Sequence, residues 1–369
     1  MPMAESSVSY KCPNCSAPLT FLPGHEQVTC EYCGNEFAVK TIEELFQSQE
    51  KRAAKEAEAK QAKWATEQAG SNWSADEAAA LHVCICSSCG AEVVTDNNTM
   101  ATECCYCGNP TMIPKNFAGM LKPDYIIPFK KTKEDAVAAL KEFYKGKILL
   151  PSAFTANNRV ESIQPMYVPF WLFDSAVSAH ANFRATKSVV YDDGDETVTE
   201  TSHFACERGG RMAFHRIPVD GSQKMDNDYM ESIEPFDYRD LVPFSTAYLT
   251  GYLADRYDED AETSAPRADK RVEHSVLAVL EESVKGYESV NLQDSAIVKE
   301  KSEVSYGMVP VWILTTRYKD QPYTFMMNGQ TGKMVGSLPA DGTKEFLYPA
   351  IVFLITLPLL YYLAKYIVV

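Results

Sequence analysis

Eight cysteines near the start of the chain are spaced for metal binding. They form four Cys-x-x-Cys pairs in two groups, with fourteen residues between the pairs of each group. The second group repeats the first 74 positions later, and both groups run on into Gly-Asn. The groups are Cys12, Cys15, Cys30 and Cys33, then Cys86, Cys89, Cys104 and Cys107. Since a Cys-x-x-Cys turn directs two thiolates to one point, each group predicts a tetrahedral zinc site.

Two structural zinc ions are therefore expected. Four thiolates fill the tetrahedron and leave no position for a reactive water. A ribbon of about thirty residues buries too little apolar surface to fold without its metal. Disulfides or ordinary buried thiols are the alternative, which two copies at identical spacing disfavour. We expect Cys84 and Cys105 to be unligated and Cys206 to be a small buried hydrophobe.

Short hairpins must carry these ligands, which predicts β zinc ribbons at 9–40 and 82–115. Residues 41–81 are rich in Ala, Glu, Lys and Gln and predict a charged helical linker between the ribbons. Thr41 with Glu44 forms a capping box at the start of this helix, and Gly70 ends it. A short second helix is expected at 72–80.

Residues 122–340 predict a mixed α+β domain with an antiparallel sheet. Segment 166–217 alternates apolar and polar residues around an Asp-Gly turn at 193–194, which is typical of an antiparallel meander. A hairpin with turn residues at 328–332 is expected at the end of the domain. The whole chain is thus expected to be a multidomain α+β protein.

This domain also shows traces of internal duplication. Val-Pro-Phe-Trp at 168–171 is echoed by Val-Pro-Val-Trp at 309–312. Ile-Pro-Phe at 127–129 is echoed by Val-Pro-Phe at 242–244, and an amphipathic run follows each. Each half is expected to be a helix that leads to a strand opening with Val-Pro.

The sequence shows no catalytic or nucleotide-binding motif, so we expect a protein that is not an enzyme. It lacks a phosphate loop, His-Glu-x-x-His and Gly-x-Ser-x-Gly. His203, Cys206 and His215 could form a metal or nucleophilic cluster, but no fourth ligand or base accompanies them. Scattered strand positions are the favoured interpretation of these three residues.

Residues 346–367 predict a transmembrane helix. The stretch from 346 to 363 carries no charge, and with its tail it is long enough to cross about 30 Å of hydrocarbon. A buried core helix is the alternative, but it would normally show a polar stripe. The N-terminus has no signal peptide, and zinc-binding thiols are typical of the cytosol. We expect a single-pass, tail-anchored membrane protein whose N-terminal bulk is cytoplasmic.

The charge of the chain disfavours nucleic acid as a partner. The formal net charge is −15, and residues 1–115 hold eight basic and fifteen acidic side chains. Binding to a duplex depends on Lys and Arg neutralising several phosphates, and this surface would repel them. Protein partners at the membrane, together with the bilayer itself, are the expected contacts.

The motifs resemble those of the bacterial membrane proteins known as transcription-factor-IIB-type zinc-ribbon-containing proteins. These motifs are Cys-Pro-x-Cys at 12–15, Cys-x-Tyr-Cys-Gly at 30–34, Val-Pro-Phe-Trp at 168–171 and Met-Asn-Gly-Gln-Thr-Gly-Lys at 327–333. Some members resemble components of a membrane complex that recruits phage-shock-type membrane-stress proteins. The resemblance implies a scaffold role of that kind.

Three hypotheses follow. The favoured one is a membrane-anchored cytosolic adaptor whose ribbons bind a protein partner. The second is a membrane-tethered regulator whose ribbons contact RNA polymerase or DNA. The third is an enzyme with a site in the α+β domain that the sequence does not reveal.

Overall fold

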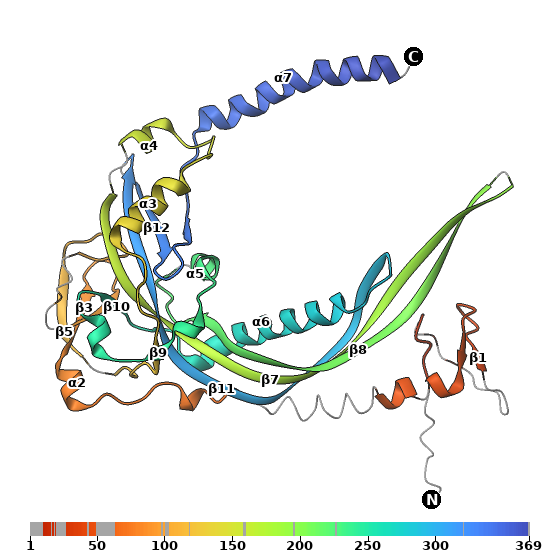
Figure 1. Cartoon of the computed structure of the whole chain (residues 1–369), viewed down its shortest axis with the longest axis horizontal. Helices are drawn as coiled ribbons and strands as arrows, with labels where there is room; N and C mark the ends of the chain where they lie inside the picture. Colours follow the sequence, from red (N-terminus) through yellow and green to blue (C-terminus); the bar gives the residue numbers. More distant parts are fainter. Residues whose placement is uncertain are drawn as a thin grey trace, which may run out of the picture. The chain divides into compact units, whose positions relative to one another are not determined.

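The computed structural model describes residues 10–15, 17, 19, 27–42, 44–48, 63–96, 99, 103–117, 119–157, 160–194, 196–225, 227–319 and 321–367 (Figure 1). Contacts divide the chain into two compact units. Unit 1 comprises 1–67, 172–218 and 265–304, and unit 2 comprises 68–171, 219–264 and 305–369. Three long strands pass through both units: β7 (Val160–Asp193), β8 (Glu196–Asp220) and β11 (Ser289–Tyr318).

The strands of unit 2 belong to a mixed sheet with the order β13-β12-β11-β7-β10-β4-β3-β5. Strand β10 runs parallel to β7, and β6 runs parallel to β11, whereas β4 and β12 pair antiparallel with their neighbours. The sheet therefore contains parallel pairs, and the prediction of an antiparallel sheet is wrong. The shorter strands are β3 (Leu81–Cys86), β4 (Glu92–Asp96), β5 (Met112–Asn116), β6 (Tyr125–Ile126), β9 (Val242–Pro243), β10 (Leu253–Asp255), β12 (Gln321–Asn328) and β13 (Met334–Gly336).

The second ribbon is part of this sheet. Its strands β3, β4 and β5 pair with one another, and β4 continues into the rest of the sheet through β10. Val93, Val94, Thr95 and Asp96 are all buried in β4, which is the pattern of a strand covered on both faces. The residues of ribbon 2 are therefore a structural part of unit 2 and not a free module on a spacer.

Two tryptophans of the repeated motif lie in the core of unit 2. Trp171 on β7 donates from Nε1 to the carbonyl of Glu259 at 2.9 Å, and Trp312 on β11 donates to the carbonyl of Lys131 at 2.9 Å. Helix α3 (Lys133–Phe143) begins at the capping box of Thr132 and packs Leu140 against Trp312 and Phe325. These indole hydrogen bonds join β7 to Glu259 and β11 to Lys131, which directly precedes the cap of α3.

The echoed segments occupy matching places. Strands β6 and β9 pair antiparallel, and each lies next to one of the two Pro-Phe sequences. Pro169 in β7 and Pro310 in β11 have no backbone N–H to donate. The carbonyl of Pro169 accepts from the amide of Gly221 at 2.9 Å, and the carbonyl of Pro310 accepts from the amide of Gly329 at 2.8 Å. The sequence predicted that each Val-Pro motif opens a strand. This is wrong, because both motifs lie inside long strands.

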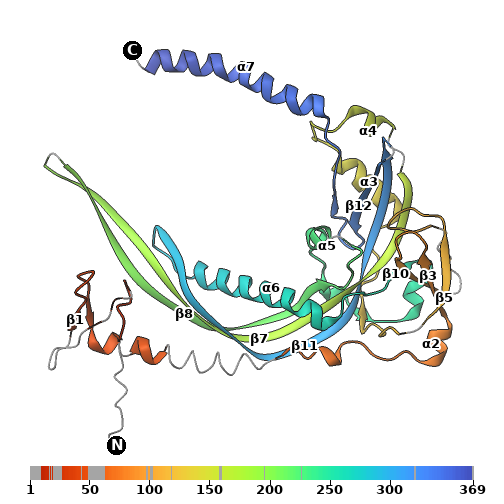
Figure 2. The ribbon, with the colours of Figure 1, turned by 180° about the vertical axis from the view of Figure 1, so that it is seen from behind.

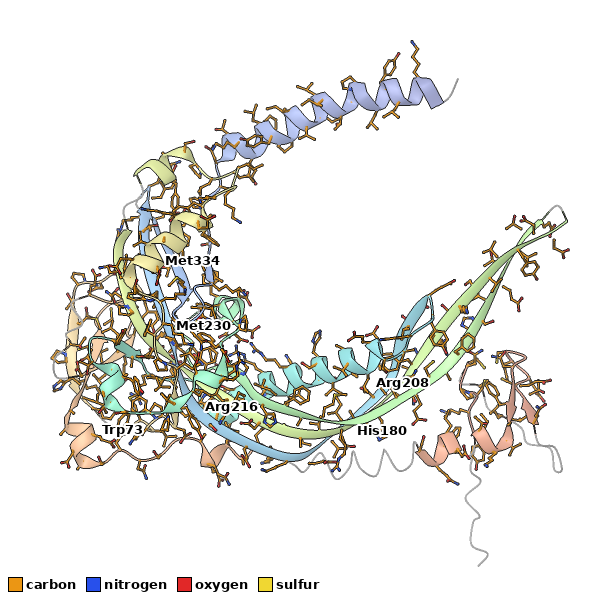
Figure 3. All side chains as sticks on the ribbon, in the orientation of Figure 1. Trp73, His180, Arg208, Arg216, Met230 and Met334 are labelled. Carbon is orange, nitrogen blue, oxygen red and sulfur yellow. The ribbon has the colours of Figure 1, made fainter. Side chains whose placement is uncertain are left out.

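Smaller elements complete unit 2. They are α2 (Ala75–Ala79), α4 (Ser152–Asn157), α5 (Asn227–Ile233), η2 (Tyr238–Asp240) and η3 (Thr246–Leu249). Trp73, labelled in Figure 3, precedes α2 and packs edge-on against Phe117 and Phe244 at centroid distances of 5.1 and 5.7 Å. The expected turn at Asn328–Gly332 joins β12 to β13.

In unit 1, the three long strands are accompanied by helix α6 (Ala261–Glu282), which runs along them in both views (Figure 1, Figure 2). Its buried residues Ala268, Val272, Val276 and Leu280 recur every fourth position and give one apolar face. Strands β7 and β8 pair with each other across the predicted Asp-Gly turn, where Gly194 has a φ of 71°. Two long strands therefore occupy the segment in which a meander was predicted. Trp64 packs edge-on against Phe173 of β7.

The first ribbon has a sheet of its own, in which β1 (Gln27–Thr29) pairs antiparallel with β2 (Glu36–Ala38). The helix after it starts at Val39 and not at Thr41, and its described residues end at Ser48. Residues 49–62 of the predicted linker lie outside the described residues. From Lys63 to Ala65 the chain is not helical, and η1 (Thr66–Gln68) follows, so the expected helix does not extend to Gly70.

The last element is α7 (Gly342–Ile367), where a transmembrane helix was predicted at 346–367. In the part of the chain that the structure describes, no helix is long and apolar enough to cross a membrane. This finding corrects the predictions of a tail anchor and of a single-pass membrane location.

Candidate metal centres

The first cysteine group is assembled by two backbone turns of the same form. The amide of Cys12 donates to the carbonyl of Ala17 at 2.7 Å, and the amide of Cys30 donates to the carbonyl of Asn35 at 2.8 Å. Gly34 lies at a φ of 73°, a conformation that glycine adopts without strain, and its amide closes the second turn onto Cys30. This is why Gly follows the second Cys pair.

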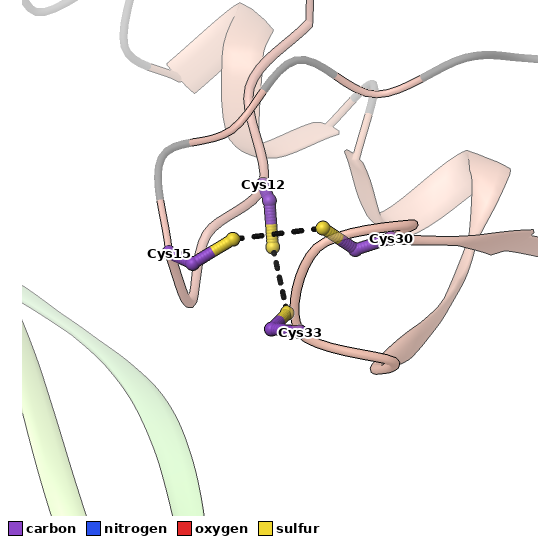
Figure 4. Close-up of side chains that lie close together, drawn as sticks. All are labelled: Cys12, Cys15, Cys30 and Cys33. Atoms are coloured by element: carbon purple, nitrogen blue, oxygen red, sulfur yellow. Dashed lines mark hydrogen bonds between the residues drawn. The ribbon is translucent and has the colours of Figure 1, made fainter.

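The four sulfur atoms of this group point toward one another (Figure 4). Cys12 Sγ lies 3.6 Å from Cys33 Sγ, and Cys15 Sγ lies 3.5 Å from Cys30 Sγ. A tetrahedron with metal–sulfur bonds of about 2.3 Å requires sulfur–sulfur separations of about 3.8 Å. A disulfide requires about 2.05 Å, so the spacing fits a shared metal ion and not a covalent bond.

The second group repeats this geometry in unit 2. Cys86 Sγ lies 3.6 Å from Cys107 Sγ, and Cys89 Sγ lies 3.6 Å from Cys104 Sγ. The same turns recur: the amide of Cys86 donates to Ala91 at 2.9 Å, and the amide of Cys104 donates to Asn109 at 2.8 Å. All four sulfur atoms of each group lie within 4.8 Å of one another. The structure thus brings together all eight predicted ligands in two clusters, each able to hold one metal ion.

Hydrogen bonds favour the thiolate at Cys104 and Cys30, whereas burial raises the pKa of Cys12 and Cys89 to about 12. The thiol of Cys105 donates to Cys104 and, with backbone amides, lowers the pKa of Cys104 to about 4. At Cys30 burial opposes ionisation, but the backbone amides of Cys33 and Tyr32 lower the pKa to about 7. A thiolate is the form that binds metal. Cys105 lies outside the group of four sulfur atoms, but its thiol contacts Cys104, which is one of the four.

Ribbon 2 is fixed in unit 2 by contacts around its second turn. The hydroxyl of Tyr106 donates to Met166 Sδ at 3.5 Å, and its side chain also contacts the carboxyl of Asp255. The Ser222 hydroxyl donates to Asp255 Oδ2 at 2.5 Å. Arg256 bonds Glu92 on β4, and Gln164 donates to Glu103 at 3.1 Å.

Ribbon 1 has a different environment. Its small core contains Leu19, Val28 and Ile42, and Tyr10 packs edge-on against Phe46. The guanidinium of Arg184 on β7 donates to the carbonyl of Asn14 inside the first turn. Tyr32, at the tip of the second turn, is 75% exposed.

The other sequence candidates do not form a cluster with a metal-binding arrangement among the described residues. Cys206 is buried, and with His203 it lines a cavity of about 280 Å³ in unit 1 beside ribbon 1. His215 instead bonds Asp174 at 3.2 Å. The cavity mixes Lys11, Arg184 and Glu207 with aromatic rings, a composition that selects no ligand class.

Sequence reasoning missed Asp255 and Ser222. Neither belongs to a recognisable motif, because β10 and the segment after β8 meet only in the folded chain. Burial raises the pKa of Asp255 to about 7, while Ser222, Tyr106 and the amide of Arg256 partly offset this. Tyrosine at the Cys-x-Tyr-Cys position was the only local signal pointing to this contact.

No protein-family model matches the chain, and no solved structure matches it. The chain is similar to the uncharacterized protein YdjG of Bacillus subtilis strain 168, at 32% identity over 337 residues. The match covers 91% of this chain and 92% of YdjG. The two proteins therefore correspond over nearly their full lengths.

Proposed function

We propose that this chain, which belongs to the protein family of Bacillus subtilis YdjG, is a zinc-ribbon adaptor that binds other proteins and catalyses no reaction. The observation that carries the proposal is the contrast between the two ribbons. Ribbon 2 continues the sheet of unit 2 through β4 and β10, whereas ribbon 1 has its own two-stranded sheet and an exposed turn. One ribbon supports the fold and the other offers a rigid surface.

Zinc is the metal that this donor set favours. Four thiolates in a tetrahedron suit Zn²⁺ or an iron–sulfur site, and the two-turn ribbon with fourteen residues between its pairs is typical of structural zinc. With four sulfur ligands no coordination position is open to water or substrate. We therefore propose a structural role for both ions.

Charge supports protein over nucleic acid as the partner. In ribbon 1, Glu31 and Glu36 are exposed. The chain as a whole carries a formal net charge of −15. Phosphate backbones would be repelled by such a surface. The resemblance to transcription-factor-IIB-type zinc-ribbon proteins supports partners of the phage-shock type.

The test is affinity purification of the tagged full chain from cells that produce it, followed by identification of bound proteins and reconstitution from pure components. The control variant is Cys12→Ser, which removes a ligand of ribbon 1 only. We expect a stoichiometric protein partner that binds the wild type and is lost with Cys12→Ser. Fluorescence anisotropy with duplex DNA at about 0.15 M salt should show no binding. Binding to DNA, or to no protein at all, would contradict the adaptor function.

A further inference from the structure

The two ribbons present a tyrosine at equivalent positions. Tyr32 and Tyr106 are 74 residues apart, like the cysteines that flank them. The turns that carry them have the same hydrogen bonds: the amides of Cys30 and Cys104 each donate to an asparagine carbonyl at 2.8 Å. The two phenol rings therefore leave the same kind of backbone at the same point.

Tyr106 shows what this face of a ribbon can bind. Its hydroxyl contacts the thioether of Met166 on β7 and the carboxyl of Asp255 on β10. These two strands are parallel neighbours, paired at Leu253 with Met166. The ring thus lies against a sheet, with an apolar side chain and a carboxyl group at its hydroxyl.

Among the residues that the structure describes, nothing covers Tyr32 in this way. It is 75% exposed, although a ring of this size gains much by burial and tyrosine is enriched at the centres of protein interfaces. The residue before it also differs, because Glu31 is exposed where Cys105 is buried in ribbon 2. The equivalent face of ribbon 1 therefore combines an exposed aromatic ring with a negative charge.

We propose that Tyr32 of ribbon 1 docks a partner protein as Tyr106 docks the sheet of unit 2. The partner presents a β-sheet surface with an aliphatic or thioether side chain for the ring and a carboxyl group that accepts from the phenol. A lysine or arginine of the partner faces Glu31. This inference rests on the proposed adaptor function and specifies the surface that performs it.

The first experiment replaces Tyr32 with the photo-crosslinker p-benzoylphenylalanine in the full chain, in the cells that produce it. Ile113, an exposed residue of ribbon 2, is the matched control position. We expect a crosslink at position 32 that maps to a strand of the partner next to an Asp or Glu, and no crosslink to that partner from 113. A crosslink to a second copy of this chain, equal labelling from both positions, or no crosslink at all would overturn the inference.

The second experiment measures the affinity of the purified partner for variants. Interface tyrosines of this kind contribute about 2 kcal/mol or more, so Tyr32→Ala should weaken binding about 30-fold or more. Tyr32→Phe should weaken it by a smaller factor through loss of one hydrogen bond, and Glu31→Lys should weaken it by charge reversal. Ile113→Ala should leave it unchanged. Metal content equal to that of the wild type shows that each variant folds.

The two proposals can fail separately. If wild-type chain binds a partner and all three Tyr32 and Glu31 variants bind it within twofold of wild type, the adaptor function stands and the docking face is wrong. If the wild type binds no protein, both fail.

Discussion

The hydroxyl of Ser222 donates to the carboxylate of Asp255 at 2.5 Å in the interior of unit 2, where both side chains are almost completely shielded from solvent. The same carboxyl contacts the Tyr106 side chain of ribbon 2 and accepts from the amide of Arg256. One acidic group thus joins the second metal-binding ribbon to strand β10. Buried carboxyls in such networks couple stability to pH.

Asp255 should make unit 2 less stable as pH rises toward and through neutrality. Burial raises its pKa to about 7 in the folded chain, against about 3.9 when unfolded. Between these values the folded state binds more protons, so the stabilisation is present at low pH and lost as pH approaches and passes 7. Urea unfolding from pH 5.5 to 8.5 should show wild type losing stability relative to Asp255→Asn, on the order of a few kcal/mol. Parallel curves for the two proteins would contradict this assignment.

The two equivalent tyrosines should differ in their contribution to stability. Tyr106→Ala removes a ring that contacts Met166 and Asp255, and we expect a loss of about 3 kcal/mol in the free energy of unfolding. Tyr32→Ala removes an exposed ring and should change it by less than about 0.5 kcal/mol. Chemical denaturation followed by tryptophan fluorescence measures both. A large cost at Tyr32 would show that its ring is packed within this chain.

Gly329 should not tolerate a side chain. A Cβ atom there would lie 2.7 Å from the ring of Phe129 and 2.9 Å from Pro310 Cβ, so Gly329→Ala should cost about 1–3 kcal/mol through overpacking. At Gly210 a Cβ would meet nothing within 4 Å, and Gly210→Ala is the control with a change below about 0.5 kcal/mol. Melting temperatures in one buffer compare the two. Equal effects would mean that the turn can shift to admit the methyl group.

The hydrogen bonds of the neighbouring Asn328 explain a motif of the sequence. Asn328 donates from Nδ2 to the carbonyls of Ile233 at 3.1 Å and Pro235 at 3.2 Å, and its Oδ1 accepts from the amides of Gln330 and Thr331. All four hydrogen bonds join the Asn328 side chain to backbone groups and so hold the turn in place. The segment Met-Asn-Gly-Gln-Thr-Gly-Lys at 327–333 is therefore a structural turn in this chain.

The metal clusters could be predicted because their information is local. Two residues inside each pair and a fixed distance between pairs determine where the sulfur atoms lie, whatever the rest of the fold is. The Asp-Gly turn at Gly194 and the hairpin of β12 and β13, with its turn at 328–332, were local in the same sense and are confirmed.

The remaining features depend on contacts between distant segments. The pairing of β4 with β10 joins residues about 160 positions apart, so nothing near Val94 indicates that ribbon 2 enters a larger sheet. The alternation of apolar and polar residues along β7 also does not predict that β10 pairs parallel with it. The linker helix was predicted to be too long, because alanine and glutamate favour helix locally. In the folded chain, Trp64 packs against Phe173 and donates to Asp269 at 2.9 Å.

Metal loss should affect the two units unequally. Cys86→Ser disrupts a ribbon whose strands continue the sheet of unit 2, and we expect a fall in melting temperature of several degrees or more. Cys12→Ser disrupts a ribbon with its own two-stranded sheet and should leave the main unfolding transition nearly unchanged. Differential scanning calorimetry compares them. A larger effect of Cys12→Ser would reverse the roles assigned to the ribbons.

Native mass spectrometry with elemental analysis, on chain purified without chelators or added metal, tests the central claim most directly. We predict two zinc ions in the wild type and one each in Cys12→Ser and Cys86→Ser. A wild-type chain that carries no metal, or whose mass shows these cysteines oxidised to disulfides, would contradict it.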